Sequence, residues 1–200
     1  MNLSRERLTQ VAEQTSFRPE VLEKAIRLLD LLEGFRSHPF LADRFALKGG
    51  TALNLFVFDV PRLSVDIDLN YTGAIEREVM LVERPKLEEA VQAVCSREGF
   101  AIRRLPQEHA GGKWTLRYES AAGGGANLEV DLNFMFRVPL WPIVFRDSKN
   151  IGPYKAQGIP VLDIHELAAG KLAALLARHA GRDLFDAHLL LTQGRLDADR

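Results

Sequence analysis

The sequence predicts an α+β fold, with strands and helices in a core and a helical C-terminal part. Strict alternation of apolar and polar residues over 63–70 and 127–134 predicts strands that bury one face. Apolar residues at helical spacing over 18–35 predict an amphipathic helix ahead of them. We therefore expect a core domain at residues 1–160, which includes N-terminal helices, and a helical region at 161–200 packed on that core.

The composition is typical of a soluble globular protein. The chain has 200 residues, of which 46% are hydrophobic and 26% charged, and its net charge of −1 does not indicate a nucleic-acid binder by itself. No apolar run approaches the roughly 20 residues of a membrane helix. The first ten residues lack the apolar core of a secretory signal. A single cysteine, Cys95, excludes an intramolecular disulfide. We expect a cytoplasmic protein with no membrane partner.

Turn residues and helix-start residues set the expected bounds of the first elements. Pro19 suits the first turn of a helix, and Gly34 is expected to end that helix. A short apolar run then leads into a glycine pair, and the helix after that pair breaks near Pro61. The expected elements are a helix at 18–35, a strand at 45–47, a helix at 52–58 and a strand at 63–70.

The second half of the chain is expected to add strands and then helices. Pro85 leads into a helix, and a run of three glycines at 123–125 forms a loop between strands. Asp163 and Glu166 have the spacing of a capping box, which predicts a helix start, and Gly181 interrupts the helical pattern that follows. The expected elements are a helix at 84–98, paired strands at 100–105 and 113–119, a strand at 127–134, and helices at 163–179 and 182–193.

A glycine pair follows the strand expected at 45–47. Gly49 and Gly50 let the backbone approach a phosphate closely, because neither residue has a side chain in the way. The helix that follows adds backbone N–H donors and the positive end of its dipole, and Thr51 adds a hydroxyl group. The segment therefore predicts a phosphate-binding turn.

Three carboxylates fall on the polar faces of two predicted strands. Asp66 and Asp68 share one face of the first strand, and Asp131 lies on the matching face of the later one. Like charges side by side require a cation, and a divalent ion such as Mg²⁺ or Mn²⁺ takes oxygen ligands and shares its shell with triphosphate oxygens. If the strands are neighbours, the acids predict a two-metal site, in which one ion lowers the pKa of an attacking hydroxyl and the other steadies a pyrophosphate leaving group.

The order of these motifs resembles a known family. KGGTAL followed by RLSVDIDL is similar to the opening motif of the AbiEii/MenT-type nucleotidyltransferases, a branch of the polymerase-β-like superfamily that includes toxins of toxin–antitoxin pairs. The superfamily pattern is Gly-Gly-Ser/Thr, a helix, Asp-x-Asp and a later third acid. These positions fall here at Gly49, Gly50, Thr51, Asp66, Asp68 and Asp131. The resemblance spans about residues 45–191 and implies a small mixed sheet flanked by helices. Family members are often longer, with further C-terminal helices.

This branch also carries a lysine on a downstream helix and then an Arg-Asp-x-x-Asp segment, which resemble Lys171 and residues 182–186. Lys171 and Arg178 are seven residues apart, so they share one helix face, where either could meet a triphosphate. The resemblance implies catalytic roles for Asp66, Asp68, Asp131, Lys171 and Asp186. It implies nucleotide contacts from Lys48, Gly49, Gly50, Thr51, Ser64, Lys171, Arg178 and Asp183.

The resemblance implies a Mg²⁺-dependent nucleotidyltransferase that moves a nucleoside monophosphate from a nucleoside triphosphate to a hydroxyl and releases pyrophosphate. By family analogy the acceptor is a tRNA 3′ end, and a separately encoded antitoxin is the partner. A second hypothesis is transfer to a protein side chain or to a small molecule such as an aminoglycoside, and a third is a non-catalytic binding module. A basic surface around the acids would favour RNA, whereas an acidic or narrow pocket would favour a small molecule.

Overall fold

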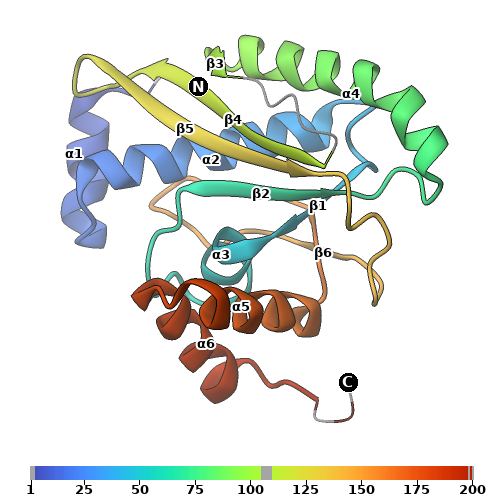
Figure 1. Cartoon of the computed structure of the whole chain (residues 1–200). Helices are drawn as coiled ribbons and strands as arrows, with labels where there is room; N and C mark the ends of the chain where they lie inside the picture. Colours follow the sequence, from blue (N-terminus) through green and yellow to red (C-terminus); the bar gives the residue numbers. More distant parts are fainter. Residues whose placement is uncertain (1–2, 105–109, 198, 200) are drawn as a thin grey trace.

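The computed structural model describes residues 3–104, 110–197 and 199, and Figure 1 shows how its helices and strands are arranged. The helices are α1 (Arg5–Thr15), α2 (Pro19–Ser37), α3 (Gly49–Thr51), the π-helix η1 (Ala52–Val57), α4 (Arg77–Arg97), α5 (Ile164–Arg178) and α6 (Gly181–Gln193). The strands are β1 (Phe45–Lys48), β2 (Asp66–Tyr71), β3 (Ala101–Arg104), β4 (Gly111–Glu119), β5 (Gly125–Asn133), β6 (Val144–Arg146) and β7 (Ile159–Val161). The predicted α+β fold is confirmed. Leu105, the expected end of one strand, lies outside the described residues.

The strands form one mixed sheet in the order β3-β4-β5-β2-β1-β7-β6. β4 pairs antiparallel with β3, as expected for the strands at 100–105 and 113–119, and it also pairs antiparallel with β5 across the three-glycine loop. β2 pairs antiparallel with β1 and parallel with β5, while β1 pairs parallel with β7. The parallel pairing of β2 with β5 brings together two segments that are far apart in the sequence.

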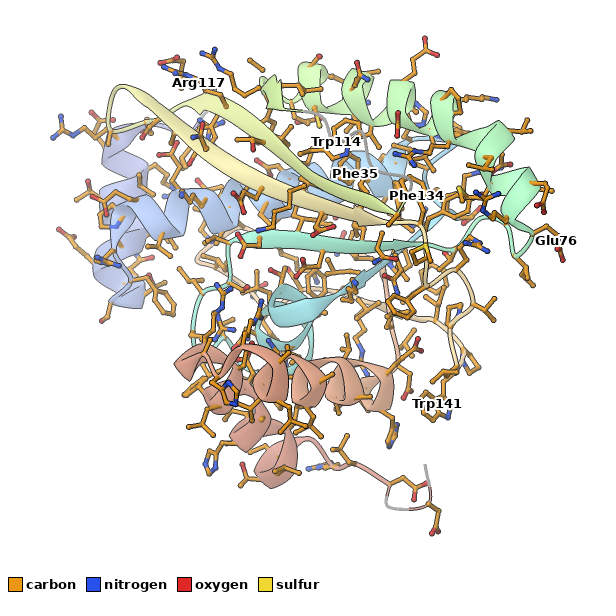
Figure 2. The ribbon with its side chains drawn as sticks, viewed as in Figure 1. Phe35, Glu76, Trp114, Arg117, Phe134 and Trp141 are labelled. Carbon is orange, nitrogen blue, oxygen red and sulfur yellow. The ribbon has the colours of Figure 1, made fainter. Side chains whose placement is uncertain are left out.

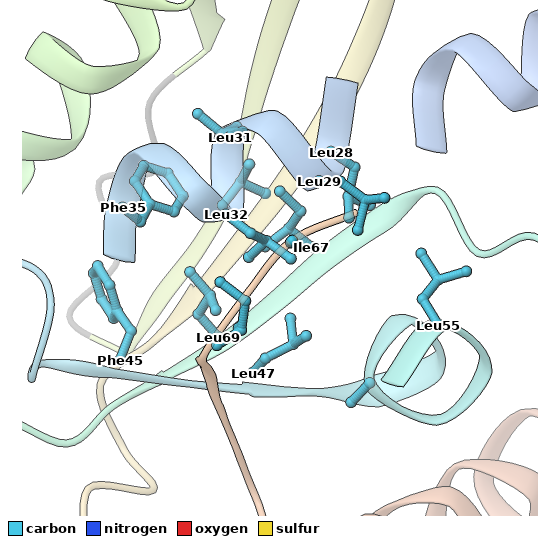
Figure 3. Close-up of a cluster of buried hydrophobic side chains, with 14 of the residues drawn as sticks. Leu28, Leu29, Leu31, Leu32, Phe35, Phe45, Leu47, Leu55, Ile67 and Leu69 are labelled. Carbon is cyan, nitrogen blue, oxygen red and sulfur yellow. The ribbon is translucent and has the colours of Figure 1, made fainter. Parts of the chain in front are cut away.

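The apolar core lies between α2 and the middle of the sheet (Figure 3). Leu29 and Leu32 of α2 belong to one buried cluster with Leu47 of β1 and with Ile67 and Leu69 of β2. Successive side chains of a strand point to opposite faces, so burial of one apolar face of β2 directs its two acids to the other face. The hydrophobic effect on one face of the sheet thus orients the charged groups on the other.

Two helices are longer than the sequence predicted. α2 continues through Gly34 to Ser37, and a Cβ at Gly34 would come 2.8 Å from Cγ1 of Val94 in α4. The glycine therefore allows α2 and α4 to pack closely and does not end α2. α4 begins at Arg77, so Pro85 lies inside the helix instead of at its start. Proline removes one backbone donor, but the helix continues on both sides of it.

The C-terminal helices form a pair at the end of the molecule away from α4 (Figure 1). α5 packs against α6 and also contacts α3 and η1, the elements that follow the glycine pair. The break between the two helices falls at His179, which has a left-handed backbone conformation (φ 51°). Across the described residues, no helix combines the length and the hydropathy of a membrane-spanning segment.

Candidate active site

Neighbouring strands β2 and β5 present four carboxylates on one face of the sheet, the three predicted acids and Glu129. The parallel register pairs Asp68 with Asp131, and it pairs Asp66 with Glu129. Ile67, between the two acids of β2, is fully buried on the opposite face. The condition set by the sequence, that the two acid-bearing strands be neighbours, is therefore met.

The glycine pair packs directly against the strand that carries these acids. Gly49 has φ +72°, and a Cβ there would come 2.2 Å from Oδ2 of Asp68. Both the left-handed conformation and the close approach therefore require glycine. A Cβ at Gly50 would come 3.0 Å from Nη2 of Arg62 and from Oγ of Ser64. The turn is thus fitted between the acids and the cations of the site.

Thr51 has a different role from the predicted phosphate contact through its hydroxyl. Its side chain is fully buried, and Oγ1 donates a hydrogen bond of 2.5 Å to the backbone carbonyl of Asp66. A hydroxyl enclosed in this way is turned to the protein and not to a ligand. Thr51 therefore ties the glycine turn to β2 and helps to set the position of the acids.

Lys171 and Arg178 of α5 meet at one buried carboxylate. Nζ of Lys171 lies 3.0 Å from Oδ1 of Asp183, and Arg178 donates to both oxygens of the same group at 2.6 and 2.9 Å. The predicted common face of the two cations is confirmed. The hydrogen bonds from Arg178 hold the pKa of Asp183 far below its ordinary value, with Lys171 adding to the effect and burial opposing it. Asp183 therefore remains charged and fixes two cations beside the acids.

Asp186 is enclosed by donors, which corrects the prediction that it is catalytic. It is fully buried, accepts hydrogen bonds of 2.9 and 2.5 Å from Arg62 and one of 3.1 Å from Asn54, and lies 2.9 Å from Nζ of Lys171. Burial opposes the charged form, but these donors outweigh it and lower the pKa of Asp186. A carboxylate enclosed in this way is turned to the protein, and it holds Lys171 and Arg62 in place.

The acids and the cations line one cavity of about 150 Å³. Lys113 at its edge is paired with Glu129 at 2.9 Å, which raises the pKa of the lysine. Lys48 and Gly49 are outside this lining, and Lys48 acts instead through its charge on Asp68. The lining residues are Gly50, Arg62, Ser64, Asp66, Ile67, Asp68, Lys113, Glu129, Asp131, Lys171, Arg178 and Arg182.

Asp68 has surroundings that favour a bound cation. Burial raises its pKa, the charge of Lys48 opposes that rise, and the charges of Asp131 and Asp66 add to it. A cation at the carboxylates would relieve both the burial of the charge and the repulsion. The three acids offer only carboxylate oxygens, which are the ligands that Mg²⁺ prefers. Within the described ranges, no three His, Cys, Asp or Glu side chains are arranged to hold a metal ion by themselves.

No site role was predicted for Asn54, Arg62, Lys113, Glu129 and Arg182, although Arg62 and Arg182 stand in the two motifs that resemble the family. Arg62 belongs to the RLSVDIDL segment, but its partner is 124 residues away, so no local pattern indicates the contact. The position of Glu129 could have been predicted from the sequence, because it lies two residues before Asp131 on the polar face of β5. The cavity-facing position of Arg182 depends on how α6 packs, which the local sequence does not specify.

Comparison with known proteins adds a structural relative. MenT4, a nucleotidyltransferase toxin from Mycobacterium tuberculosis H37Rv, has a similar structure with a TM-score of 0.63 and 22% sequence identity. The match covers 92% of this chain and 63% of that chain, so the present chain spans less than two-thirds of the length of MenT4. At this identity the likeness supports the fold. A search of curated proteins gives no match.

A match to a family model assigns the chain to a family, which the structural likeness alone does not. The model that describes the AbiEii toxin, a nucleotidyl transferase of type IV toxin–antitoxin systems, matches residues 30–200. This range includes the glycine turn, the three acids and both C-terminal helices. The chain therefore belongs to the AbiEii nucleotidyltransferase toxin family.

Proposed function

We propose that this protein is a Mg²⁺-dependent nucleotidyltransferase that transfers a nucleoside monophosphate from a nucleoside triphosphate to a hydroxyl acceptor. The observation that carries the proposal is the pairing of Asp68 with Asp131 beside cations that buried carboxylates hold in place. Membership of the AbiEii family supports the same class of reaction.

Asp66, Asp68 and Asp131 are proposed to hold the metal ion. Mg²⁺ usually takes one or two protein carboxylates and completes its shell with water and substrate phosphates, which suits an open set of acids on two strands. When bound, the ion would lower the pKa of the acceptor hydroxyl and neutralise charge on the departing pyrophosphate. The raised pKa of Asp68, caused first by burial, supports a cation at this place.

The triphosphate is proposed to lie between Gly50 and the cations of α5. Nε and Nη2 of Arg178 are bonded to Asp183, which leaves the other N–H groups of its guanidinium for phosphate oxygens, and Lys171 supplies a point charge. Their carboxylate partners Asp183 and Asp186 hold both cations before substrate arrives. Such preorganisation lowers the entropy lost when the transition state forms.

The proposed reaction forms one bond and breaks another at the α-phosphorus. The acceptor oxygen attacks this phosphorus, and the bond from it to the oxygen that bridges to the β-phosphate breaks. Pyrophosphate leaves with the bonding electron pair. Asp131 is proposed to take the proton of the acceptor hydroxyl, because it is opposite Asp68 at the edge of the cavity.

We propose RNA, and specifically a tRNA 3′ end, as the acceptor. Lys113 at the cavity edge is paired with Glu129, but exposed Arg182 adds positive charge there, which suits a phosphate backbone better than a cationic aminoglycoside. The family description, which names a type IV toxin–antitoxin system, supports a separately encoded antitoxin as partner. The acceptor and the antitoxin both rest on family analogy together with this charge distribution.

Incubation with α-labelled nucleoside triphosphates, Mg²⁺ and total RNA tests the proposal. We expect label to enter RNA with the wild-type protein, and we expect no label when Mg²⁺ is chelated. The combined variant Asp66→Ala, Asp68→Ala should lose the transfer. The control is Glu119→Gln, which removes an exposed carboxylate at the far end of β4.

Equal labelling by the double alanine variant and by the wild-type protein would show that the assigned metal site is wrong. Labelling of added protein or of an aminoglycoside in place of RNA would keep the reaction class and replace the acceptor. Circular dichroism of each variant separates a loss of chemistry from a loss of fold.

A further inference from the structure

The loop that follows β5 presents exposed apolar side chains close to the acids. Met135 and Phe136 are 61% and 67% exposed. Phe136 is only five residues beyond Asp131 in the chain, and Val138 and Leu140 in the same loop are also exposed. Exposed apolar groups gathered in one loop indicate contact with a ligand.

The backbone of this loop is held in place although its side chains are exposed. Oδ1 of Asn133 accepts hydrogen bonds from the backbone N–H groups of Met135 and Phe136, at 2.8 and 3.0 Å. Arg137 donates through Nη1 to the carbonyl of Phe134 at 2.7 Å. The ring of Phe134 is buried and lies 5.6 Å from that of Tyr71, measured between centroids. Figure 2 labels Phe134 at this end of the sheet. The exposed ring of Phe136 is therefore attached to a backbone that hydrogen bonds hold in place.

Lys48 connects this loop to the acids. Lys48 is the register partner of Asp68 in the β1–β2 pair, and its charge acts on that carboxyl group. Its Nζ lies 6.0 Å from the centroid of the Phe136 ring. A single lysine side chain thus spans the distance from Phe136 to the acid site.

Asn70 lies on the same face of β2 as Asp66 and Asp68. It follows Asp68 by two residues, pairs in register with Asn133 and is buried. Its Oδ1 has no hydrogen-bond partner among the residues that the structure describes. A buried acceptor without a partner is costly, and this one follows Asp68 on β2 in the direction of the loop.

The size of the cavity leaves part of a nucleotide outside it. The cavity is about 150 Å³ in volume and almost wholly lined by charged and polar groups. Pockets for organic ligands are commonly about 300–1,000 Å³. The cavity therefore suits phosphates, and a nucleobase attached to them requires an apolar surface nearby.

We propose that Phe136 is a stacking platform for a nucleobase, with Lys48 alongside it. This inference rests on the proposed function, because it assumes that a nucleotide occupies the acid site. Stacking on an aromatic ring tolerates any base, since every base has a π-face. The base belongs either to the incoming nucleotide or to the terminal nucleotide of the acceptor, and the chemistry of recognition is the same.

Three variants test the platform. Phe136→Ala removes the ring, and Phe136→Trp keeps an aromatic surface. The matched control is Phe145→Ala, on the edge strand β6 at the other side of the sheet. Phe145 is 59% exposed and has the guanidinium of Arg36 at 6.0 Å from its ring, so it resembles Phe136 in exposure and in charge environment.

Calorimetric titration with Mg²⁺ present measures the binding of each base source separately. The first set of probes is ATP, GTP, CTP and UTP, each compared with ribose 5-triphosphate, which lacks a base. The second set is a short single-stranded oligoribonucleotide compared with the same oligonucleotide ending in an abasic residue. We expect Phe136→Ala to weaken one base-containing set about 5- to 150-fold and to leave its base-free partner unchanged. Phe136→Trp should bind within about threefold of the wild-type protein.

The outcomes separate this inference from the proposed function. Weakening of the triphosphates assigns the platform to the incoming base, and weakening of the oligonucleotide assigns it to the acceptor. Equal affinities for wild type and Phe136→Ala, an equal loss in Phe145→Ala, or no binding of either probe set to the wild type would overturn the platform. Normal transfer to RNA by Phe136→Ala with unchanged affinities would overturn the platform and leave the proposed function unaffected. Base-dependent binding without any transfer would overturn the function and keep the platform.

Discussion

Asp68 is the residue at which function and stability oppose each other. Its carboxyl group is buried against the backbone of Gly49 and lies near Asp66 and Asp131, so its charged form is disfavoured without a cation. Only the metal-bound state would fully compensate this charge. Active sites often retain such unfavourable groups because the chemistry requires them.

Asp68→Asn should therefore keep or raise the melting temperature of the metal-free protein while it abolishes transfer. The amide has the same size as the carboxyl group and removes a buried like charge. We expect an increase of up to about 1 kcal/mol in the free energy of unfolding and a loss of activity of roughly 100-fold or more. Thermal unfolding in the presence of a chelator, together with the transfer assay, measures both. A clear drop in melting temperature would show that the charge of Asp68 stabilises the fold.

At the level of residues, the sequence predicts side chains that follow a local period and misses those that act through distant partners. Strand alternation correctly placed Asp66, Asp68 and Asp131 on one face, because Ile67, Leu69, Val130 and Leu132 are buried on the other. The enclosure of Asp186 could not be predicted, because its donors come from η1, α5 and the segment before β2. The same limit explains why the hydroxyl of Thr51 was assigned to a phosphate.

At the level of elements, the close contact of α2 with α4 depends on a glycine. Gly34→Ala should destabilise the protein, since its Cβ would come 2.8 Å from the branched side chain of Val94. We expect a loss of about 1–3 kcal/mol in the free energy of unfolding, in spite of the better helix propensity of alanine. Gly170→Ala in α5 is the matched control, because a Cβ there meets nothing within 4 Å. It should gain about 0.5–1 kcal/mol, and urea denaturation compares the two. Stabilisation by both substitutions would contradict the packing account.

Asp30 makes the stability of α2 depend on pH. Burial raises its pKa from 3.8 to about 6, and the charge of Glu98 contributes to the rise. The folded state therefore holds this proton more tightly than the unfolded state, so the contribution of Asp30 to stability falls as pH rises from about 4 through 6. Asp30→Asn should be more stable than the wild-type protein by roughly 1–2 kcal/mol at pH 8, with the difference vanishing near pH 4. Denaturation curves at a series of pH values measure this difference, and a constant offset across that range would refute the assignment.

The order of the strands in the sheet could not be predicted from local sequence patterns. Long alternating strands such as β2 and β5 could be predicted, because their period is local. β6 and β7 were missed, since three residues are too few to show a period and β7 is buried throughout. β7 nevertheless pairs with β1 and leads directly into α5. Tertiary pairing, which local pattern does not specify, decides where the C-terminal helices are anchored.

At the level of the whole molecule, a charged network joins the strand core to the C-terminal helices. Arg62 precedes β2, Asp186 lies on α6, and Lys171 of α5 contacts the same carboxylate. Because the carboxylate is fully buried, removal of Arg62 leaves its charge to Lys171 and Asn54 alone, and removal of Asp186 takes the carboxylate from Arg62. The network therefore couples the fold of α6 to the position of Lys171, which is proposed to bind phosphate.

A double-mutant cycle on Arg62 and Asp186 tests that coupling. Asp186→Ala should cost about 3–5 kcal/mol of unfolding free energy, because it leaves Arg62 without its carboxylate and Lys171 with Asp183 alone. The double variant Arg62→Ala, Asp186→Ala should be at least about 1 kcal/mol more stable than the sum of the single effects predicts. Chemical denaturation of the four proteins gives the cycle. Additivity within about 0.5 kcal/mol would contradict a network that spans the two parts.

The central claim is that acids on two neighbouring strands form one nucleotidyl-transfer site. The most direct measurement is the rate of α-label transfer to RNA by Asp131→Asn, with wild type and Glu119→Gln alongside and with binding of Mg²⁺ and nucleoside triphosphate measured on the same samples. We predict that Asp131→Asn folds normally and transfers at least about 100-fold more slowly, whereas Glu119→Gln transfers at the wild-type rate. Transfer by folded Asp131→Asn at the wild-type rate would contradict the pairing of Asp68 with Asp131 as the chemical centre of this protein.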